Sequence, residues 1–163
     1  MIIEGQIKGI KNSKKSLLLI DTPGINNSLD LNHAQITRDV CHPRTFSEYV
    51  KCFGLKHSTG VWEDNAEILL RERNVPFADL LAHREDVYEY LLKHGIEKDT
   101  AFEIAEYVRK GKANRRGWTP EMLEALDEAG IPDWFRGSCE KIRYLFTRAH
   151  AMTLYRNYCK EIM

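Results

Sequence analysis

Helix start and stop signals recur from His42 to the end of the chain and constrain its fold more than any other feature. Thr45 and Glu48 have the spacing of a capping box, in which each side chain hydrogen-bonds to the backbone of the other residue. Thr119 followed by Pro120 is typical of a helix start, because proline fits the first helical position. Signals of this kind predict a mostly α-helical structure.

Helix ends are indicated where Gly95 and Gly130 are each followed by isoleucine. The two stretches are similar enough to predict two stacked helix-turn-helix units, although any two glycine-terminated helices would share the pattern. Helices are expected from Thr45 to Gly54, from Asp64 or Asn65 onward, over Arg84–His94, from Asp99 or Thr100 with Phe102 in the apolar stripe, over Thr119–Gly130, from Pro132, and from about Gly137 to the end. Lys110–Gly117 is expected to be a basic loop.

Residues 1–41 have a different pattern. The apolar run Leu17–Ile20 stops at Asp21-Thr22-Pro23-Gly24, which predicts a short N-terminal β-hairpin or extended arm, followed by a polar linker. The same stretch resembles the second phosphate-sensing motif of GTPases. The phosphate-binding loop that this motif serves has no counterpart in the sequence, so a strand running into a tight turn is the preferred interpretation. We expect two parts, residues 1–41 and 42–163.

The charge balance excludes a uniformly basic protein, because 24 Lys and Arg offset 24 Asp and Glu. No apolar run reaches the ~18 residues of a membrane helix, and no signal peptide is evident. The four cysteines lack C-x-x-C spacing, which favours free thiols and a cytoplasmic location. No zinc-ligand spacing, D-x-D pair or G-x-S-x-G motif occurs. We therefore expect no cofactor, no metal site and no independent catalysis.

Basic residues gather in two stretches of the sequence. Arg109, Lys110, Lys112, Arg115 and Arg116 follow one another with no acidic residue between them, and Arg136, Lys141, Arg143, Arg148 and Arg156 are interrupted only by Glu140. Such cationic side chains bind phosphate groups of nucleic acids, and His150 adds a further donor. The alternative is a solvated charged surface without a ligand.

Several blocks between His42 and Ala151 share their order with one family. They are Arg44–Glu48, Gly54–Trp62, Asn65-Ala66, Arg84–Val87, Ala101–Ile104, Val108–Lys112, Pro132–Trp134, Ser138–Ile142 and Tyr144–Ala151. In these blocks the chain resembles the PolC-type alpha subunit of bacterial DNA polymerase III. The resemblance implies the helical fingers region, which closes over the incoming nucleotide and the template end of the DNA. We therefore expect residues 42–163 to form a fingers-like domain.

The resemblance also implies which residues meet the ligand. Charge-assisted contacts to DNA or nucleotide phosphates are expected from His57, Arg109, Lys110, Lys112, Arg148 and His150. The expected partners are primer–template DNA or a nucleotide, with replication proteins as further partners and no membrane. The sequence indicates no particular oligomeric state.

Departures from the family argue against polymerase chemistry by this polypeptide. The palm with the catalytic aspartates has no counterpart here, the family has an acidic residue at Gly60 and lysine at Arg148, and the chain becomes polar after His150. A non-catalytic DNA-binding module is the first hypothesis. A protein-interaction module is the second, and a gene remnant fused to a GTPase fragment is the third.

Overall fold

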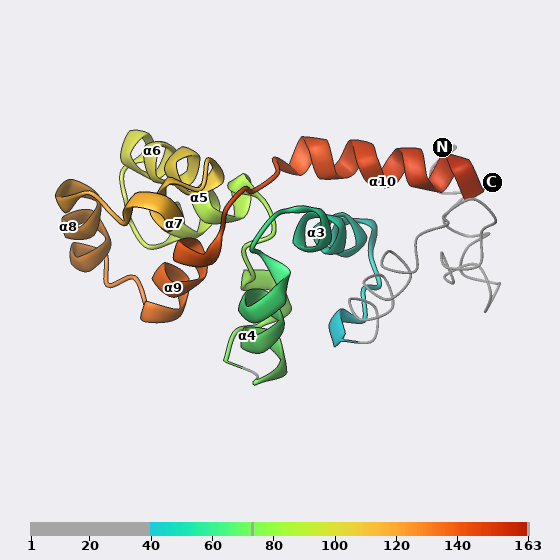
Figure 1. The fold of residues 1–163 in the computed structure, drawn as a ribbon, viewed down its shortest axis with the longest axis horizontal. Helices are drawn as coiled ribbons and strands as arrows, with labels where there is room; N and C mark the ends of the chain where they lie inside the picture. The colour runs from blue at the N-terminus through green and yellow to red at the C-terminus, as the bar shows by residue number, and fades with distance from the viewer. Residues whose placement is uncertain (1–39, 73, 163) are drawn as a thin grey trace.

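The computed structural model describes residues 40–72 and 74–162, and over these residues the fold is helical (Figure 1). The helices are α3 (Phe46–His57), α4 (Glu67–Arg71), α5 (Arg84–Lys93), α6 (Lys98–Arg109), α7 (Lys112–Arg116), α8 (Pro120–Glu128), α9 (Asp133–Lys141) and α10 (Arg148–Ile162), with helical turns at Trp62–Ala66 and Phe77–Asp79. The prediction of a mostly α-helical fold is confirmed. The expected N-terminal hairpin lies outside the described residues, and the boundary at residue 42 stays a prediction.

Two groups of helices make up the described molecule. Figure 1 shows α5 to α9 together at one end, α10 running above α3 toward the other end, and α4 projecting between the two groups. The larger core lies among α5 to α9 and reaches Leu55 at the end of α3, and its fully buried side chains include Leu80, Leu91, Ile104, Phe135 and Leu145. A smaller core of Val50, Ala151 and Tyr155 joins α3 to α10. No helix in the described part of the chain is long and apolar enough to cross a membrane.

The predicted helix starts at Thr45 and Thr119 are confirmed. The Thr45 hydroxyl accepts from the Glu48 amide at 3.2 Å, and the Glu48 carboxylate accepts from the Thr45 amide at 2.9 Å. The Thr119 hydroxyl accepts from the Met122 amide at 3.3 Å. Helix α3 nevertheless continues to His57 instead of ending at Gly54. Gly54 is helical and buried, and a Cβ there would collide with the His83 ring and the Ala82 carbonyl, so this glycine permits close packing.

Other predicted helix boundaries and faces differ from the structure. The expected loop at Lys110–Gly117 contains helix α7, which buries Ala113 against the core. Helix α6 is capped by Glu97, whose carboxylate accepts from the amides of Asp99 and Thr100. Phe102, expected in the apolar stripe, is 49% exposed. Asp64 and Asn65 do not cap α4, which has no side-chain cap.

The expected last helix is divided by an extended segment, residues 142–147, which separates α9 from α10. The amides of Arg143 and Tyr144 both donate to the Thr59 carbonyl, and the Thr59 amide donates to the Tyr144 carbonyl at 2.8 Å. The Leu145 amide donates to the Arg109 carbonyl at 3.1 Å. This segment is therefore held by α6 and by the loop after α3.

Candidate nucleic-acid interface

Two aromatic side chains of the extended segment point outward. Ile142 and Leu145 are fully buried, whereas Tyr144 is 43% exposed and Phe146 is half-buried. The rings of Tyr144 and Phe146 meet edge to face, with centroids 5.5 Å apart. The Phe146 amide donates to the Ser58 hydroxyl and its carbonyl accepts from the Arg84 amide, so the backbone beneath both rings is fixed.

Cationic or titratable side chains flank this aromatic pair on both sides. The Arg109 guanidinium carbon lies 5.9 Å from the Tyr144 ring centroid. On the other side, the His150 ring lies 4.5 Å from the Phe146 ring, edge to face. We call Arg109, Tyr144, Phe146 and His150 the aromatic row. It brings together residues from α6, the extended segment and the start of α10.

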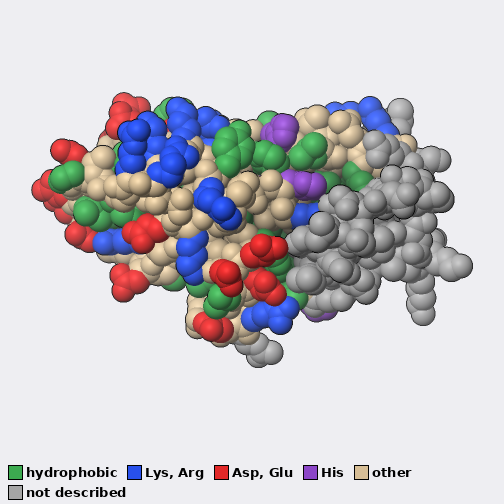
Figure 2. All heavy atoms as spheres, in the orientation of Figure 1, with side chains coloured by type: hydrophobic (Ala, Val, Ile, Leu, Met, Phe, Trp, Pro, Cys, Tyr) green, Lys and Arg blue, Asp and Glu red, His purple; other side chains and the backbone are tan. Residues whose placement is uncertain are grey.

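Basic side chains border the aromatic row. Figure 2 shows Lys and Arg side chains gathered over the part of the surface formed by α6 and α7, with hydrophobic and His side chains beside them. Lys110, Arg115 and Arg116 are exposed, and the Lys112 ammonium lies 5.7 Å from the Tyr107 ring centroid. Arg109, the last residue of α6, directly precedes Lys110 and so joins the aromatic row to these basic residues. The first basic stretch is therefore at least partly exposed at all five of its cations.

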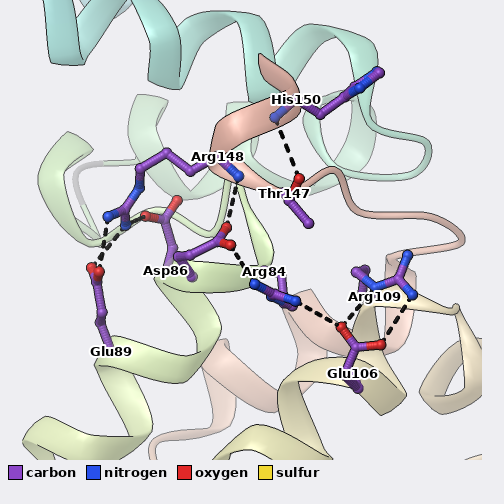
Figure 3. Close-up of polar contacts among 9 residues, drawn as sticks. Arg84, Asp86, Glu89, Glu106, Arg109, Thr147, Arg148 and His150 are labelled. Atoms are coloured by element: carbon purple, nitrogen blue, oxygen red, sulfur yellow. Dashed lines mark hydrogen bonds and ion pairs between the residues drawn. The ribbon is translucent and has the colours of Figure 1, made fainter. Parts of the chain in front are cut away.

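The charge of Arg109 is already paired in this structure. Its Nε and Nη2 atoms lie 2.9 and 3.0 Å from the two carboxylate oxygens of Glu106 (Figure 3). Hydrogen bonds from Arg109, together with those from Arg84, lower the pKa of Glu106 to about 2. The same pairing raises the pKa of Arg109.

Arg148 is turned away from the aromatic row. Its guanidinium forms two 2.8 Å contacts with Glu89 and one of 3.0 Å with Asp86, while its amide donates to Glu85 at 2.7 Å. Figure 3 shows this guanidinium and the His150 ring pointing in different directions. The hydrogen bonds that Arg148 donates to Glu89 raise the pKa of Arg148, although partial burial opposes the shift. Arg148 and His150 therefore do not share one cationic surface, and phosphate contact by Arg148 stays a prediction.

His57 lies near the row at the end of α3. It is exposed, its ring is 5.3 Å from that of Phe53, and the next residue, Ser58, holds the Phe146 amide. Its expected contact with phosphate also stays a prediction.

Two cations of the second basic stretch are bound within the protein. Arg136 pairs with Asp127 at 2.6 Å, and the Lys141 ammonium donates to the Asp64 carbonyl. Both cations join neighbouring elements, because Asp127 belongs to α8 and Asp64 to the turn before α4.

A buried ionic cluster at the start of α5 was not found from the sequence. Asp86 accepts from the amides of Ala82 and His83 at 2.9 and 3.0 Å, and it lies 3.6 Å from the Lys51 ammonium. Burial alone would raise the pKa of Asp86, but hydrogen bonding to His83 and the charge of Lys51 hold it well below its usual range. Lys51, His83, Asp86 and Arg148 are among the residues that line a cleft of about 460 Å³. The available signal was the position of Asp86, an acid in the first turn of a predicted helix.

The described residues show no metal-ligand cluster and no disulfide among Cys41, Cys52, Cys139 and Cys159. They contain no group of three or more His, Cys, Asp or Glu that could hold a metal ion. Cys41, Cys52, Cys139 and Cys159 are free, and burial raises the pKa of the Cys139 thiol well above its usual value.

Comparison with known proteins gives one consistent result. No protein-family model matches the chain. It is 44% identical to the DNA polymerase III PolC-type of Caldanaerobacter subterraneus subsp. tengcongensis over 110 residues. These aligned residues are 68% of this chain and 8% of the relative. The corresponding protein of Staphylococcus epidermidis is 45% identical over 109 residues (67% of this chain, 7% of the relative), and that of Staphylococcus aureus 42% over 130 residues (80% and 9%).

The matched relatives are much longer proteins. The chain spans between 7% and 9% of the length of these three curated relatives. The resemblance noted from the sequence is confirmed over most of the chain. This protein therefore carries a region related to the PolC-type DNA polymerase III.

Proposed function

We propose that the PolC-related region is a fingers-like module that binds primer–template DNA or nucleotide phosphates in cytoplasmic DNA replication, without polymerase catalysis of its own. The observation that supports this function best is the aromatic row beside the basic surface of α6 and α7. Exposed rings next to cations are the arrangement by which proteins hold nucleic acid strands whose bases are unpaired.

The chemistry of the row suits an unpaired base. Tyr144 offers an exposed ring on which a base can stack, a contact worth about 1–3 kcal/mol per base. The adjacent Lys110 ammonium and Lys112 ammonium would neutralise phosphates of the same strand. Because stacking tolerates every base, we expect binding with little sequence preference.

The remaining predicted residues have different parts in this proposal. His57 and His150 would contact the backbone at the far side of Phe146. Arg109 would contribute its charge beside the Tyr144 ring. Arg148, which pairs with Asp86 and Glu89, would reach a phosphate only after exchanging these partners, so we assign it to the attachment of α10 in the unbound protein.

Salt-dependent binding tests the proposal. Fluorescence anisotropy with labelled primer–template DNA should give an affinity that falls steeply as salt rises, because bound counterions are released. The double variant Lys110→Glu/Lys112→Glu should bind more weakly and flatten the plot of log affinity against log salt by about one unit per lysine.

The matched control is Lys93→Glu/Lys98→Glu, which makes the same change in net charge at two exposed lysines away from the aromatic row. Its binding should stay closer to that of the unaltered protein. Equal losses from both double variants would contradict a defined site. A folded protein that binds no DNA would contradict the proposal and favour a protein-interaction module.

A further inference from the structure

One carboxylate, that of Glu106, is surrounded by three cations. In addition to the paired Arg109 contacts, its Oε1 atom lies 3.2 Å from Nη1 of Arg84 and its Oε2 atom lies 3.4 Å from the Lys110 ammonium. Figure 3 shows Arg84 and Arg109 reaching this carboxylate from two sides. Two of the cations, Arg109 and Lys110, are those assigned above to the DNA-binding surface.

The Glu106 carboxylate binds these cations in the way that a phosphate group would. An arginine fork binds two oxygens of a carboxylate or of a phosphate with the same geometry, and both are strong charge-assisted contacts. The Glu106 side chain is only 19% exposed and that of Arg109 21%, so the pair is partly shielded from water and salt. A DNA phosphate therefore meets Arg109 and Lys110 with part of their positive charge already offset by Glu106.

We propose that Glu106 determines the ligand specificity of this surface: it competes with DNA phosphates for Arg109 and Lys110, so that binding depends on an unpaired base stacked on Tyr144. The inference rests on the proposed function and goes beyond it by naming the form of DNA that the site selects. Blunt duplex DNA offers phosphates but no unpaired base. A duplex with a single-stranded 5′ template extension offers both, and the stacking contact offsets the competition.

Glu106 is suited to this test because the backbone around it is held independently. The Leu145 amide is fixed by the Arg109 carbonyl, and the Gly111 backbone packs directly against the Arg143 carbonyl. Neutralising the carboxylate thus weakens its contacts with all three cations, Arg109 and Lys110 among them, while the extended segment keeps its own contacts. Helix α6 also keeps its buried face of Ala101, Ile104, Ala105 and Val108.

The experiment compares two DNA ligands and matched variants by fluorescence anisotropy. The ligands are a blunt duplex and the same duplex with a 5′ template extension. Glu106→Gln should raise the affinity for the blunt duplex by about tenfold, the scale of one charge-assisted hydrogen bond, and raise the affinity for the extended ligand less. The preference for the extended ligand should shrink accordingly. Glu103→Gln is the control, because it removes the same charge from an exposed position one turn earlier on α6.

Two more variants complete the design. Tyr144→Ala should lower the affinity for the extended ligand to that for the blunt duplex. Glu106→Asp keeps the charge but shortens the side chain, so it should also shrink the preference for the extended ligand, by a smaller factor than Glu106→Gln. It replaces Glu106→Gln in the experiment if that variant does not fold.

The outcomes separate the two proposals. If the unaltered protein binds neither ligand, the proposed function fails. If it binds DNA but Glu106→Gln behaves like Glu103→Gln, or binds the blunt duplex more weakly, the specificity role of Glu106 is overturned while the proposed function stands. If the unaltered protein binds both ligands equally, stacking does not select the ligand and the inference is likewise overturned.

Discussion

Tyr155 of α10 stacks on Tyr49 of α3, with ring centroids 5.8 Å apart and ring planes inclined by only 5°. The same ring meets Phe46 and Phe53 edge to face, each at 5.3 Å. Tyr155 is 8% exposed and is the largest side chain of the smaller core. The polar-looking C-terminal stretch is therefore attached to α3 by a cluster of aromatic rings.

Removing this ring should detach α10. Tyr155→Ala should lower the free energy of unfolding by about 3 kcal/mol, because truncating a buried aromatic side chain leaves a cavity and removes the ring contacts. Thermal or urea unfolding followed by circular dichroism measures the loss. Arg156→Ala, at an exposed neighbouring position, should change the free energy of unfolding little. Tyr155→Phe keeps the ring and should retain most of the stability of the unaltered protein. Equal stability of the Tyr155→Ala and Arg156→Ala variants would contradict this account.

Asp86 should make stability depend on pH below neutrality. Its folded-state pKa is well below the ordinary value of 3.8, so its contribution is complete above about pH 4 and is lost as the pH falls further. Asp86→Asn should cost about 3 kcal/mol at pH 7, because it leaves Lys51 buried without its charge partner.

Urea unfolding between pH 2 and pH 7 tests this sign. The difference in stability between the unaltered protein and Asp86→Asn should narrow as the pH falls below 4. A constant difference over this range would show that Asp86 acts through shape alone. Asp99→Asn, at an exposed position in α6, is the control for a lost carboxylate.

Gly111 should tolerate no side chain. Its φ of +65° is a left-handed conformation, and a Cβ would collide with the Arg143 carbonyl. Gly111→Ala should therefore cost more than about 2 kcal/mol. Gly95 has a φ of +87° with open space around it, so Gly95→Ala carries only the conformational cost of about 1 kcal/mol. Comparing the two by chemical unfolding isolates the collision, and equal losses would contradict it.

Arg148 should control how firmly the first turn of α10 is attached. Arg148→Gln removes the contacts with Asp86 and Glu89, and the partly exposed position limits the loss to about 1 kcal/mol. Hydrogen exchange followed by mass spectrometry should show faster exchange of the amides near Ala151, with α8 unchanged. Unchanged exchange at the start of α10 would contradict this role.

Local signals predicted the helices well where the signal and its partner are close in the sequence. Thr45 and Glu48 cap α3 within one turn, and Thr119 with Pro120 starts α8 in the same way. Gly54 was misread as a helix end because the reason for this glycine, the His83 ring, lies in a different part of the chain.

The candidate site was predictable in part. The run from Arg109 to Arg116 covers the end of α6 and all of α7, and Lys110, Arg115 and Arg116 are exposed, because residues this close in sequence stay close in the fold. The orientation of Arg148 depends on Asp86 and Glu89, which are supplied by another helix, and no spacing in the sequence encodes this pairing. Tyr144 was not among the predicted site residues for the same reason, because only the folded chain places Arg109 over its ring.

The extended segment of residues 142–147 contacts several elements at once and buries Ile142 and Leu145 in the larger core. Its backbone hydrogen-bonds to Thr59 after α3, to Arg84 at the start of α5 and to Arg109 at the end of α6. A ligand resting on Tyr144 would thereby brace both groups of helices at once. Binding of a ligand to Tyr144 should then raise the midpoint of heat denaturation of the whole described region. Thermal-shift screening of short oligonucleotides can therefore detect even weak binders.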